Sequence, residues 1–121
     1  SRRGPPDSDA VTLSDLERID QIAALYRHWQ REAGVARFLL LILPDIGRFR
    51  DPDPRVDALR QALEDQAVSF VDLADLADRT DREQFPTLFY PGDHHWTDRG
   101  HEWAANRIAT ILGSRLEEPG Q

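Results

Sequence analysis

Cysteine is absent from this 121-residue sequence, so no disulfide can form and the redox compartment stays undetermined. Positive charge is also scarce, because 15 basic residues face 22 acidic ones and the formal net charge is −7. This balance argues against nucleic acid or an anionic membrane as the main partner. Long apolar runs are missing too, since the longest, Phe38 to Leu43, is far too short to span a bilayer. We therefore expect no membrane insertion within this chain.

The two ends of the chain lack apolar patterning. Ser1 to Pro6 is polar, with no apolar segment behind its arginines, so no signal peptide is expected. Residues 1–11 are predicted to be a disordered tail, and residues 117–121 a second tail. Residues 12–116 are predicted to form a single α/β domain, large enough to bury a core without disulfides. The compartment is not determined by the sequence.

The first periodic segment predicts a long amphipathic helix that begins after Thr12 or Ser14. Ser14 with Glu17 three residues later fits a capping box, and Gly34 is well placed to end the helix. His28 is expected to face solvent and is given no role. Apolar residues at three-to-four spacing are expected to share one side of the helix: Leu16, Ile19, Ala23, Tyr26 and Trp29.

A continuous apolar run over residues 37–44 indicates a strand buried on both faces, as in a parallel sheet. A helix over residues 56–63 and a second strand over residues 68–73 follow, and this β-α-β spacing implies adjacent parallel strands. The polar loop 46–54 lies where open α/β sheets place their ligands. The predicted fold class is α/β: a small parallel sheet flanked by helices, in the manner of a flavodoxin-like three-layer unit or half of one.

Four aspartates recur at intervals of three residues: Asp72, Asp75, Asp78 and Asp81. They could form a metal-binding acidic patch or the solvated face of a short helix. We favour the short helix, because the spacing matches no ordered calcium loop. Neither a metal nor a cofactor is expected for this chain.

The stretch from residue 89 to residue 101 concentrates the residues that could carry chemistry. Asp93 and His95 lie two residues apart, so a turn could bring the carboxylate onto the imidazole and fix its tautomer. Thr97 is predicted to cap a final helix over residues 98–112, with Asp98 in its first turn. This helix is expected to bury Trp103, Ala104, Ile108, Ile111 and Leu112.

Four interpretations compete for Asp93, His94, His95 and His101. Asp93 and His95 could be two members of a Ser-His-Asp system, with His95 as the general base. The cluster could bind a transition metal, although its spacing matches neither a zincin helix nor a zinc finger. The histidines could only pack at the start of the helix, or the loop could bind a partner. The residues alone favour packing, with catalysis next.

This block resembles the C-terminal half of the SGNH, or GDSL-like, hydrolases, in which Asp-x-His-Trp and Gly-His precede an alanine-rich helix. The matching residues are Asp93, His95, Trp96, Gly100 and His101, with Ala104 and Ala105.

The resemblance implies that His95 is the general base of a triad and that Asp93 orients its ring. It also implies that His94 and Trp96 line the substrate site, although Trp96 could equally pack at the start of the helix. His101 and Trp103 are assigned to structure.

The Gly-Asp-Ser block that supplies the nucleophile in this superfamily is missing, as are the Gly and Asn blocks that supply oxyanion donors. The alginate O-acetyltransferase-like branch also carries Asp-x-His-Trp-Thr, and there the nucleophile follows the motif by a long stretch of chain. Because only the final helix follows here, the ordinary order with an upstream serine is expected. The serines of the chain, none in a Gly-Asp-Ser context, are Ser1, Ser8, Ser14, Ser69 and Ser114.

The expected function is therefore the base-bearing part of an SGNH-type serine esterase or O-acyltransferase, inefficient by itself. Its substrate would be an ester, either a small molecule or a carbohydrate, such as one bearing an O-acetyl group. The serine would come from a missing N-terminal half of the fold or from a second chain. The alternative is a non-catalytic SGNH-derived module for binding or assembly, in which Asp93 and His95 are remnants.

Overall fold

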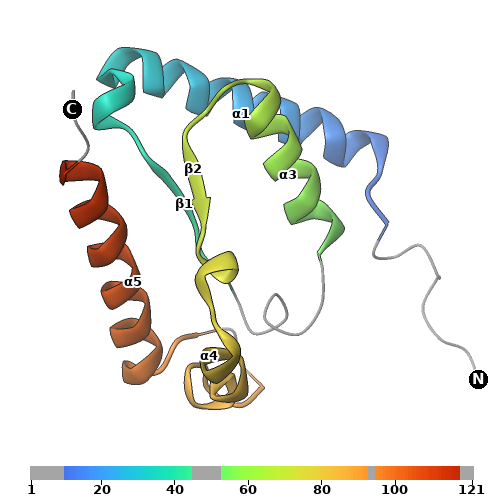
Figure 1. The fold of residues 1–121 in the computed structure, drawn as a ribbon. Coiled ribbons are helices and arrows are strands. Elements are labelled where there is room, and N and C mark those ends of the chain that lie inside the picture. Colours follow the sequence, from blue (N-terminus) through green and yellow to red (C-terminus); the bar gives the residue numbers. More distant parts are fainter. Residues whose placement is uncertain (1–9, 45–52, 93–94, 118–121) are drawn as a thin grey trace, which may run out of the picture. The chain divides into compact units, whose positions relative to one another are not determined.

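A computed structural model describes residues 10–44, 53–92 and 95–117 of the chain. It confirms the predicted class, since helices accompany a small two-stranded parallel sheet, β1-β2 (Figure 1). Both predicted tails, except for residues 10, 11 and 117, lie outside the described residues, as does most of the loop 46–54. The elements in chain order are α1 (Leu13–Ala33), η1 (Val35–Arg37), β1 (Leu40–Ile42), α3 (Pro54–Asp65), β2 (Phe70–Asp72), η2 (Leu73–Leu76), α4 (Arg79–Glu83), η3 (Phe85–Thr87) and α5 (Asp98–Glu117).

The chain forms two compact units, which are described separately. Unit 1 comprises Ser1–Leu40 and Pro52–Phe70, and unit 2 comprises Leu41–Asp51 and Val71–Gln121. The division passes through both strands of the sheet, so each unit holds part of each strand. Unit 1 therefore contains the two helices α1 and α3, whereas unit 2 contains α4 and α5.

In unit 1, α1 packs against α3 over a small core in which Ala23 and Leu63 are fully buried. The predicted face of α1 is only partly correct, because Leu16 and Trp29 remain 41% and 49% exposed. The buried residue that the apolar pattern misses is Gln30, which is 5% exposed. A glutamine at this position can be buried because the backbone beyond α3 supplies hydrogen-bond partners for its amide.

Gln30 connects α1 to the segment between α3 and β2. Its Nε2 donates to the carbonyl oxygen of Ala67 at 2.9 Å, and its Oε1 accepts from the Ser69 amide at 2.8 Å. About one helical turn before Gln30 in α1, the Arg27 guanidinium donates to the carbonyl oxygen of Gln66. These contacts provide hydrogen-bond partners for backbone groups in the segment between the end of α3 and the start of β2.

The caps of α1 correct one detail of the sequence prediction. The capping box uses Thr12 and Asp15 rather than Ser14 and Glu17: the Thr12 amide donates to Asp15 Oδ2 at 3.1 Å, and the Asp15 amide to Thr12 Oγ1 at 3.0 Å. Thr12 and Asp15 have the same three-residue spacing as Ser14 and Glu17, so both pairs fit a capping box. Because Thr12 is the cap, the helix begins at Leu13, before Ser14. Gly34 ends the helix as predicted, with a φ of 91° that favours glycine.

The strands are shorter than predicted, and the expectation of burial on both faces is wrong for the first one. Every residue of β1 is only half-buried, and Leu43 just after it is 57% exposed. Two strands shield each other only along one edge, so strand side chains keep access to solvent unless further layers cover the sheet. The apolar run of the sequence is thus suited to a larger sheet than the described residues form.

In unit 2, α5 lies against a core built from the segments before it. Trp103 and Ala104 are buried and Ile108 and Ile111 are partly buried in this core, as predicted, but Leu112 is 46% exposed because it lies beyond the edge of that face. The helix also extends past its predicted end, since Gly113 weakens a helix by only about 1 kcal/mol. The buried core residues are Leu73, Ala77, Leu88, Phe89, Trp103 and Ala104.

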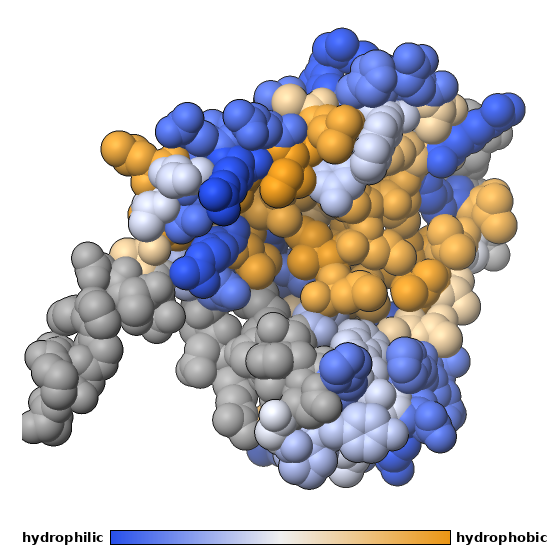
Figure 2. Space-filling view, turned by 180° about the vertical axis from the view of Figure 1, so that it is seen from behind, coloured by the Kyte–Doolittle hydropathy of each residue, from blue (hydrophilic) through white to orange (hydrophobic). Residues whose placement is uncertain are grey.

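Several large apolar side chains reach the surface in each unit. Figure 2 shows hydrophobic residues exposed across the face that it draws. No helix in the described part of the chain is long and apolar enough to cross a membrane. The most exposed apolar residues are Leu13, Trp29 and Val35 in unit 1, and Leu43, Tyr90 and Leu116 in unit 2.

Candidate functional site

The loop that carries the predicted catalytic residues is closed at its base as a small hairpin in unit 2. Phe89 and Trp96 form an antiparallel β-bridge, and the Tyr90 amide donates to the His95 carbonyl oxygen at 3.1 Å. The rings of Phe89 and Trp96 meet edge to face, with centroids 5.4 Å apart. Phe89 is 1% exposed and anchors the base of this hairpin in the core.

Thr97 joins the hairpin to the start of α5. Its amide donates to the Leu88 carbonyl oxygen at 2.9 Å, and its hydroxyl donates to the Thr87 carbonyl oxygen at 2.6 Å. The same hydroxyl oxygen accepts from the Gly100 amide at 3.2 Å, which confirms the predicted cap. One side chain thus serves both the helix and the arm of the hairpin that precedes the loop.

Gly100 explains how closely that arm approaches the helix. A Cβ atom at this position would lie 2.2 Å from the carbonyl oxygen of Leu88 and 3.2 Å from the Cβ of Trp96. Only a glycine leaves room for the backbone at Leu88 to pass over the first turn of α5. The Gly-His step of the motif therefore has a packing reason in this structure.

The predicted site residues are only partly covered by the described chain. His95 lies in the hairpin with its side chain exposed, whereas Asp93 and His94 lie outside the described residues. Trp96 is half-buried against the core, and its ring centroid lies 6.2 Å from that of Trp103, which is the packing role considered for it. Its contribution to a substrate site stays a prediction. His101 is exposed, and its ring lies 6.0 Å from that of Trp96.

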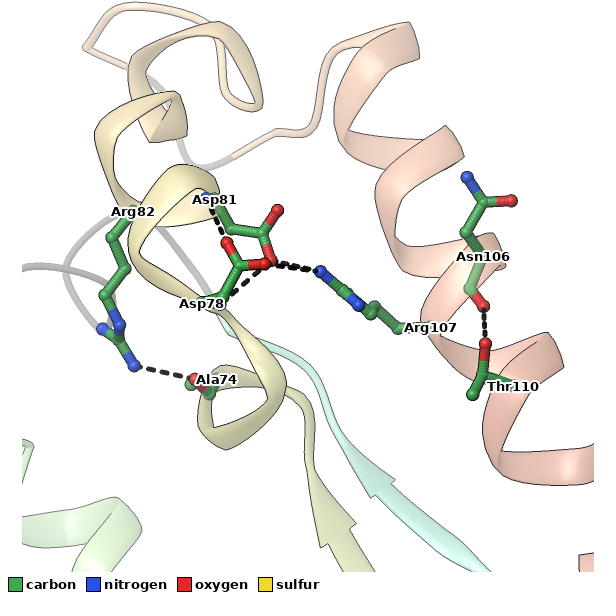
Figure 3. Close-up of polar contacts among 7 residues, drawn as sticks. All are labelled: Ala74, Asp78, Asp81, Arg82, Asn106, Arg107 and Thr110. Atoms are coloured by element: carbon green, nitrogen blue, oxygen red, sulfur yellow. Dashed lines mark hydrogen bonds and ion pairs between the residues drawn. The ribbon is translucent and has the colours of Figure 1, made fainter. Parts of the chain in front are cut away.

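The aspartates before the loop act as helix caps and ion-pair partners in this unit. Asp72 caps η2, and Asp78 caps α4 in a capping box with Asp81. The predicted solvated face of one short helix is wrong for these residues, because Asp72 is 2% exposed, the Asp81 side chain is 14% exposed, and they belong to separate elements. Arg107 of α5 reaches across to both, pairing closely with Asp81 and lying 3.7 Å from Asp78 (Figure 3). Within the described residues, no group of three or more His, Asp or Glu side chains is arranged to hold a metal.

The ion pair changes the ionisation of Asp81, whose side chain is 14% exposed. Burial raises its pKa, but the adjacent Trp103 indole, the hydrogen bonds from the Asp78 backbone and Arg107, and the charge of Arg107 together outweigh that effect. The pKa of Asp81 is therefore held below its ordinary value. This carboxylate is a structural anion that ties α4 to α5.

A polar pocket of about 320 Å³ lies beside this ion pair, along α5. Arg99 contributes a long hydrogen bond of 3.4 Å from its Nη2 to Gln84 Oε1 at its rim. This pocket could not be recognised from the sequence, because its residues come from three separate segments and follow no motif. Its lining residues are Asp81, Gln84, Leu88, Arg99, Glu102, Trp103 and Asn106.

Comparison with known proteins places most of this chain in one family. Residues 43–121 match the family described as the SGNH hydrolase-like domain of the acetyltransferase AlgX. The matched part is more than half of the chain and includes α3, β2, α5 and the whole hairpin, whereas α1 precedes it. Neither the search of curated proteins nor that of solved structures found a significant match.

Proposed function

This chain belongs to the SGNH hydrolase-like family of the acetyltransferase AlgX, and we propose that it carries the base-bearing part of an acyl-transfer site. In this proposal His95 is the general base and Asp93 orients its imidazole. The substrate is an ester, such as an O-acetyl group on a small molecule or a carbohydrate. His94 and Trp96 are proposed to line the site around that ester.

The observation that supports this proposal is the hairpin that presents His95. Its base is held by the Phe89–Trp96 bridge and by the Tyr90 amide on the His95 carbonyl oxygen, while the His95 side chain stays exposed. A general base needs a fixed backbone and an accessible ring, and catalytic groups are commonly found on loops held by a rigid scaffold. His95 combines both features, because its backbone is bonded to Tyr90 at the base of the hairpin and its side chain is exposed.

The proposed chemistry has two transfers of the acyl group. The serine oxygen attacks the ester carbonyl carbon while its proton passes to His95, and collapse of the tetrahedral intermediate breaks the bond to the alcohol oxygen. His95 then returns the proton to the departing alkoxide, leaving an acyl-serine. An incoming hydroxyl attacks this acyl group with His95 again accepting a proton. Collapse of the second tetrahedral intermediate breaks the bond to the serine oxygen, and His95 returns the proton to that oxygen. Water as the incoming group gives hydrolysis, and a sugar hydroxyl gives acyl transfer.

The nucleophile is proposed to come from outside residues 1–121. Ser14 lies in the first turn of α1, Ser69 lies just before β2 with its amide bonded to Gln30, and Ser114 is exposed on α5. None follows a strand in a Gly-Asp-Ser context. The family match is to the AlgX branch, for which the resemblance places the serine after the motif, so the match favours a serine beyond residue 121 over the upstream serine expected from the sequence.

The half-covered sheet supports docking of the part that carries the serine. In the described residues β1 and β2 pair only with each other, so each strand has a second edge to offer. Sheets with one pair of strands are marginal in water, and apolar residues such as Leu43 remain exposed beside them. A further strand and its helices would complete this sheet.

The test is labelling by a fluorophosphonate that traps activated serines, followed by intact-mass and peptide analysis. The samples are this chain and the longest native form that contains it. We expect labelling of the longer form alone, and the position of the labelled peptide before residue 1 or after residue 121 decides between the two orders. Labelling of this chain by itself would show that the assignment of an external nucleophile is wrong.

The same longer form tests the role of His95 directly. His95→Ala should lower kcat about a hundredfold to ten-thousandfold, the usual contribution of a general base, with the fold intact. His28→Ala is the matched control, because His28 is exposed on α1 and has no proposed role. Unchanged turnover in His95→Ala, or no labelling of either form, would favour the non-catalytic binding or assembly module, which the missing Gly-Asp-Ser block also suggests.

A further inference from the structure

We propose that Thr97 is a positioning residue for His95, acting through the hydrogen bond from its hydroxyl to the Thr87 carbonyl oxygen. The catalytic consequence of this proposal rests on the proposed function, but the structural part does not. The clearest sign is that Thr97 makes more contacts than a helix cap requires. A cap needs only an acceptor for the Gly100 amide, whereas the Thr97 hydroxyl also donates, at 2.6 Å, to a carbonyl on the preceding arm.

The path from Thr97 to His95 is short and consists of described contacts. The Thr97 hydroxyl fixes Thr87, its amide fixes Leu88, and the next residue, Phe89, pairs with Trp96. The Tyr90 amide then holds the carbonyl oxygen of His95 at 3.1 Å. Each step joins the two arms of one hairpin, so a displaced arm at Thr87 moves the backbone that carries His95.

The close approach of Leu88 to Gly100 leaves little freedom in the position of the arm that precedes the loop. Leu88 sits directly over the first turn of α5, where even a methyl group would overlap its carbonyl oxygen. Core packing of Leu88 and Phe89, which are 4% and 1% exposed, holds the arm from the other side. The arm therefore has one well-defined position relative to α5, and the Thr97 hydroxyl adds a side-chain hydrogen bond to the backbone bond from the Thr97 amide to Leu88.

Thr97→Asp separates the two functions of the Thr97 side chain, which are the hydrogen bond to the Thr87 carbonyl oxygen and the cap of α5. An aspartate is among the best N-cap residues, so the Gly100 amide keeps its acceptor and α5 keeps its start. An ionised carboxylate cannot donate, so the hydrogen bond to the Thr87 carbonyl oxygen is lost. Thr97→Ser keeps both functions and serves as the conservative rescue. Thr110→Val is the matched control, because Thr110 also donates its hydroxyl to a backbone carbonyl, that of Asn106, further along the same helix (Figure 3).

The first readout is amide hydrogen exchange at Tyr90 in this chain, measured by NMR. We expect exchange about tenfold faster in Thr97→Asp, because the hydrogen bond from the Tyr90 amide to His95 opens more often when the bond from Thr97 to the Thr87 carbonyl oxygen is lost. Exchange should stay within twofold of the original in Thr97→Ser and Thr110→Val. Unchanged Tyr90 exchange in a folded Thr97→Asp would overturn the proposal whether or not His95 is a catalytic base.

The second readout is turnover of the longer form that contains the serine. Thr97→Asp should lower kcat about tenfold to a hundredfold with a smaller change in KM, as expected when a catalytic group is displaced by a fraction of an ångström. Thr97→Ser should restore kcat. If Tyr90 exchange rises but kcat does not fall, Thr97 fixes the hairpin but the role of His95 as base is wrong, so the two failures are distinguishable. A fall in kcat that Thr97→Ser does not restore would overturn the positioning role.

Discussion

The two units of this chain are stabilised by different kinds of contact. In unit 1 two helices enclose a small apolar core, and a buried amide, Gln30, connects α1 to the backbone before β2. In unit 2 a larger aromatic and aliphatic core surrounds Phe89 and Trp103, and the tight step at Gly100 brings a loop onto α5. The distinctive contact of unit 1 is thus the hydrogen bonding of one buried amide, whereas that of unit 2 is the close packing at one backbone position.

This difference matches where the chemistry is proposed to lie. The hairpin with His95 is in unit 2, whose segments fall almost entirely within the family match, whereas α1 of unit 1 precedes that match. A loop that presents a catalytic group needs a fixed base, and dense packing provides one because interiors yield little to small displacements. The following substitutions test whether the two units really depend on these different contacts.

The largest effect is expected from Gly100→Ala in unit 2. The new methyl group would overlap the Leu88 carbonyl oxygen, so the free energy of unfolding should fall by about 3 kcal/mol. The control is Gly113→Ala on the same helix, where nothing lies within 4 Å of the added Cβ and the better helix propensity should stabilise by about 1 kcal/mol. Urea unfolding followed by circular dichroism measures both, and equal effects at the two glycines would refute the close packing at Leu88.

The next effect is expected from Gln30→Met in unit 1. Methionine fills a similar volume but leaves the Ala67 carbonyl and the Ser69 amide without the glutamine, which should cost about 2 kcal/mol. Gln21→Met, at an exposed position of the same helix, should change stability by less than about 0.5 kcal/mol. Amide hydrogen exchange should show reduced protection around Ser69 first. Uniformly reduced protection in both units would argue against a local role for Gln30.

A smaller effect is expected from Arg107→Gln, which removes the partner of Asp81. The cost should be roughly 1.5 kcal/mol at pH 7, because Asp81 is mostly buried but Arg107 is about one third exposed. The pKa of Asp81 is depressed in the folded chain, so its stabilising contribution is present above the ordinary value near 3.8 and is lost as the pH falls through the lower folded value.

The pH dependence provides the check on this ion pair. The original chain should lose more stability than Arg107→Gln as the pH falls, so the two unfolding curves should converge once the pH is below the depressed pKa of Asp81. Arg115→Gln, on the same helix, is the charge-matched control. Parallel curves for the original chain and Arg107→Gln would show that Asp81 is not held ionised by this arginine.

The smallest effect distinguishes two caps of α1. Thr12→Ala should lower the free energy of unfolding by about 1 kcal/mol, because Thr12 accepts the Asp15 amide in the observed capping box. Ser14→Ala should have almost no effect, although the sequence favoured Ser14 as the cap. A larger loss at Ser14 than at Thr12 in urea unfolding would restore the predicted cap.

The correct and the wrong predictions differ in the range of the interactions on which they depend. Gly34 and Thr97 were placed correctly because caps depend on residues within one turn. The failure at Ser14 has the same cause, since Thr12 with Asp15 offers the same local pattern and local rules cannot separate the two. Gln30 was missed because its partners, Ala67 and Ser69, are nearly forty residues away in sequence.

Within the candidate site, the motif identified the residues to which we assign chemistry, but not the contacts that hold them. Asp93 and His95 were recognised from their spacing and from the family resemblance, which the family match confirms at the level of the SGNH hydrolase-like domain. The double role of Thr97 and the contact of Gly100 with Leu88 were not predicted. A cap residue and a helical glycine have ordinary local explanations, so nothing in the sequence indicates that a distant backbone segment rests on them.

The sequence by itself determined the class of this protein, the helices, the alternation of helix and strand, and the residues that could move a proton. These follow from periodicity, capping and motif, which are properties of neighbouring residues. Only the tertiary structure decided which polar side chains are buried, which glycine is indispensable and how the His95 hairpin is held. Those outcomes depend on pairs of segments meeting in space, where a single carbonyl oxygen 2.2 Å from a would-be Cβ determines what is allowed.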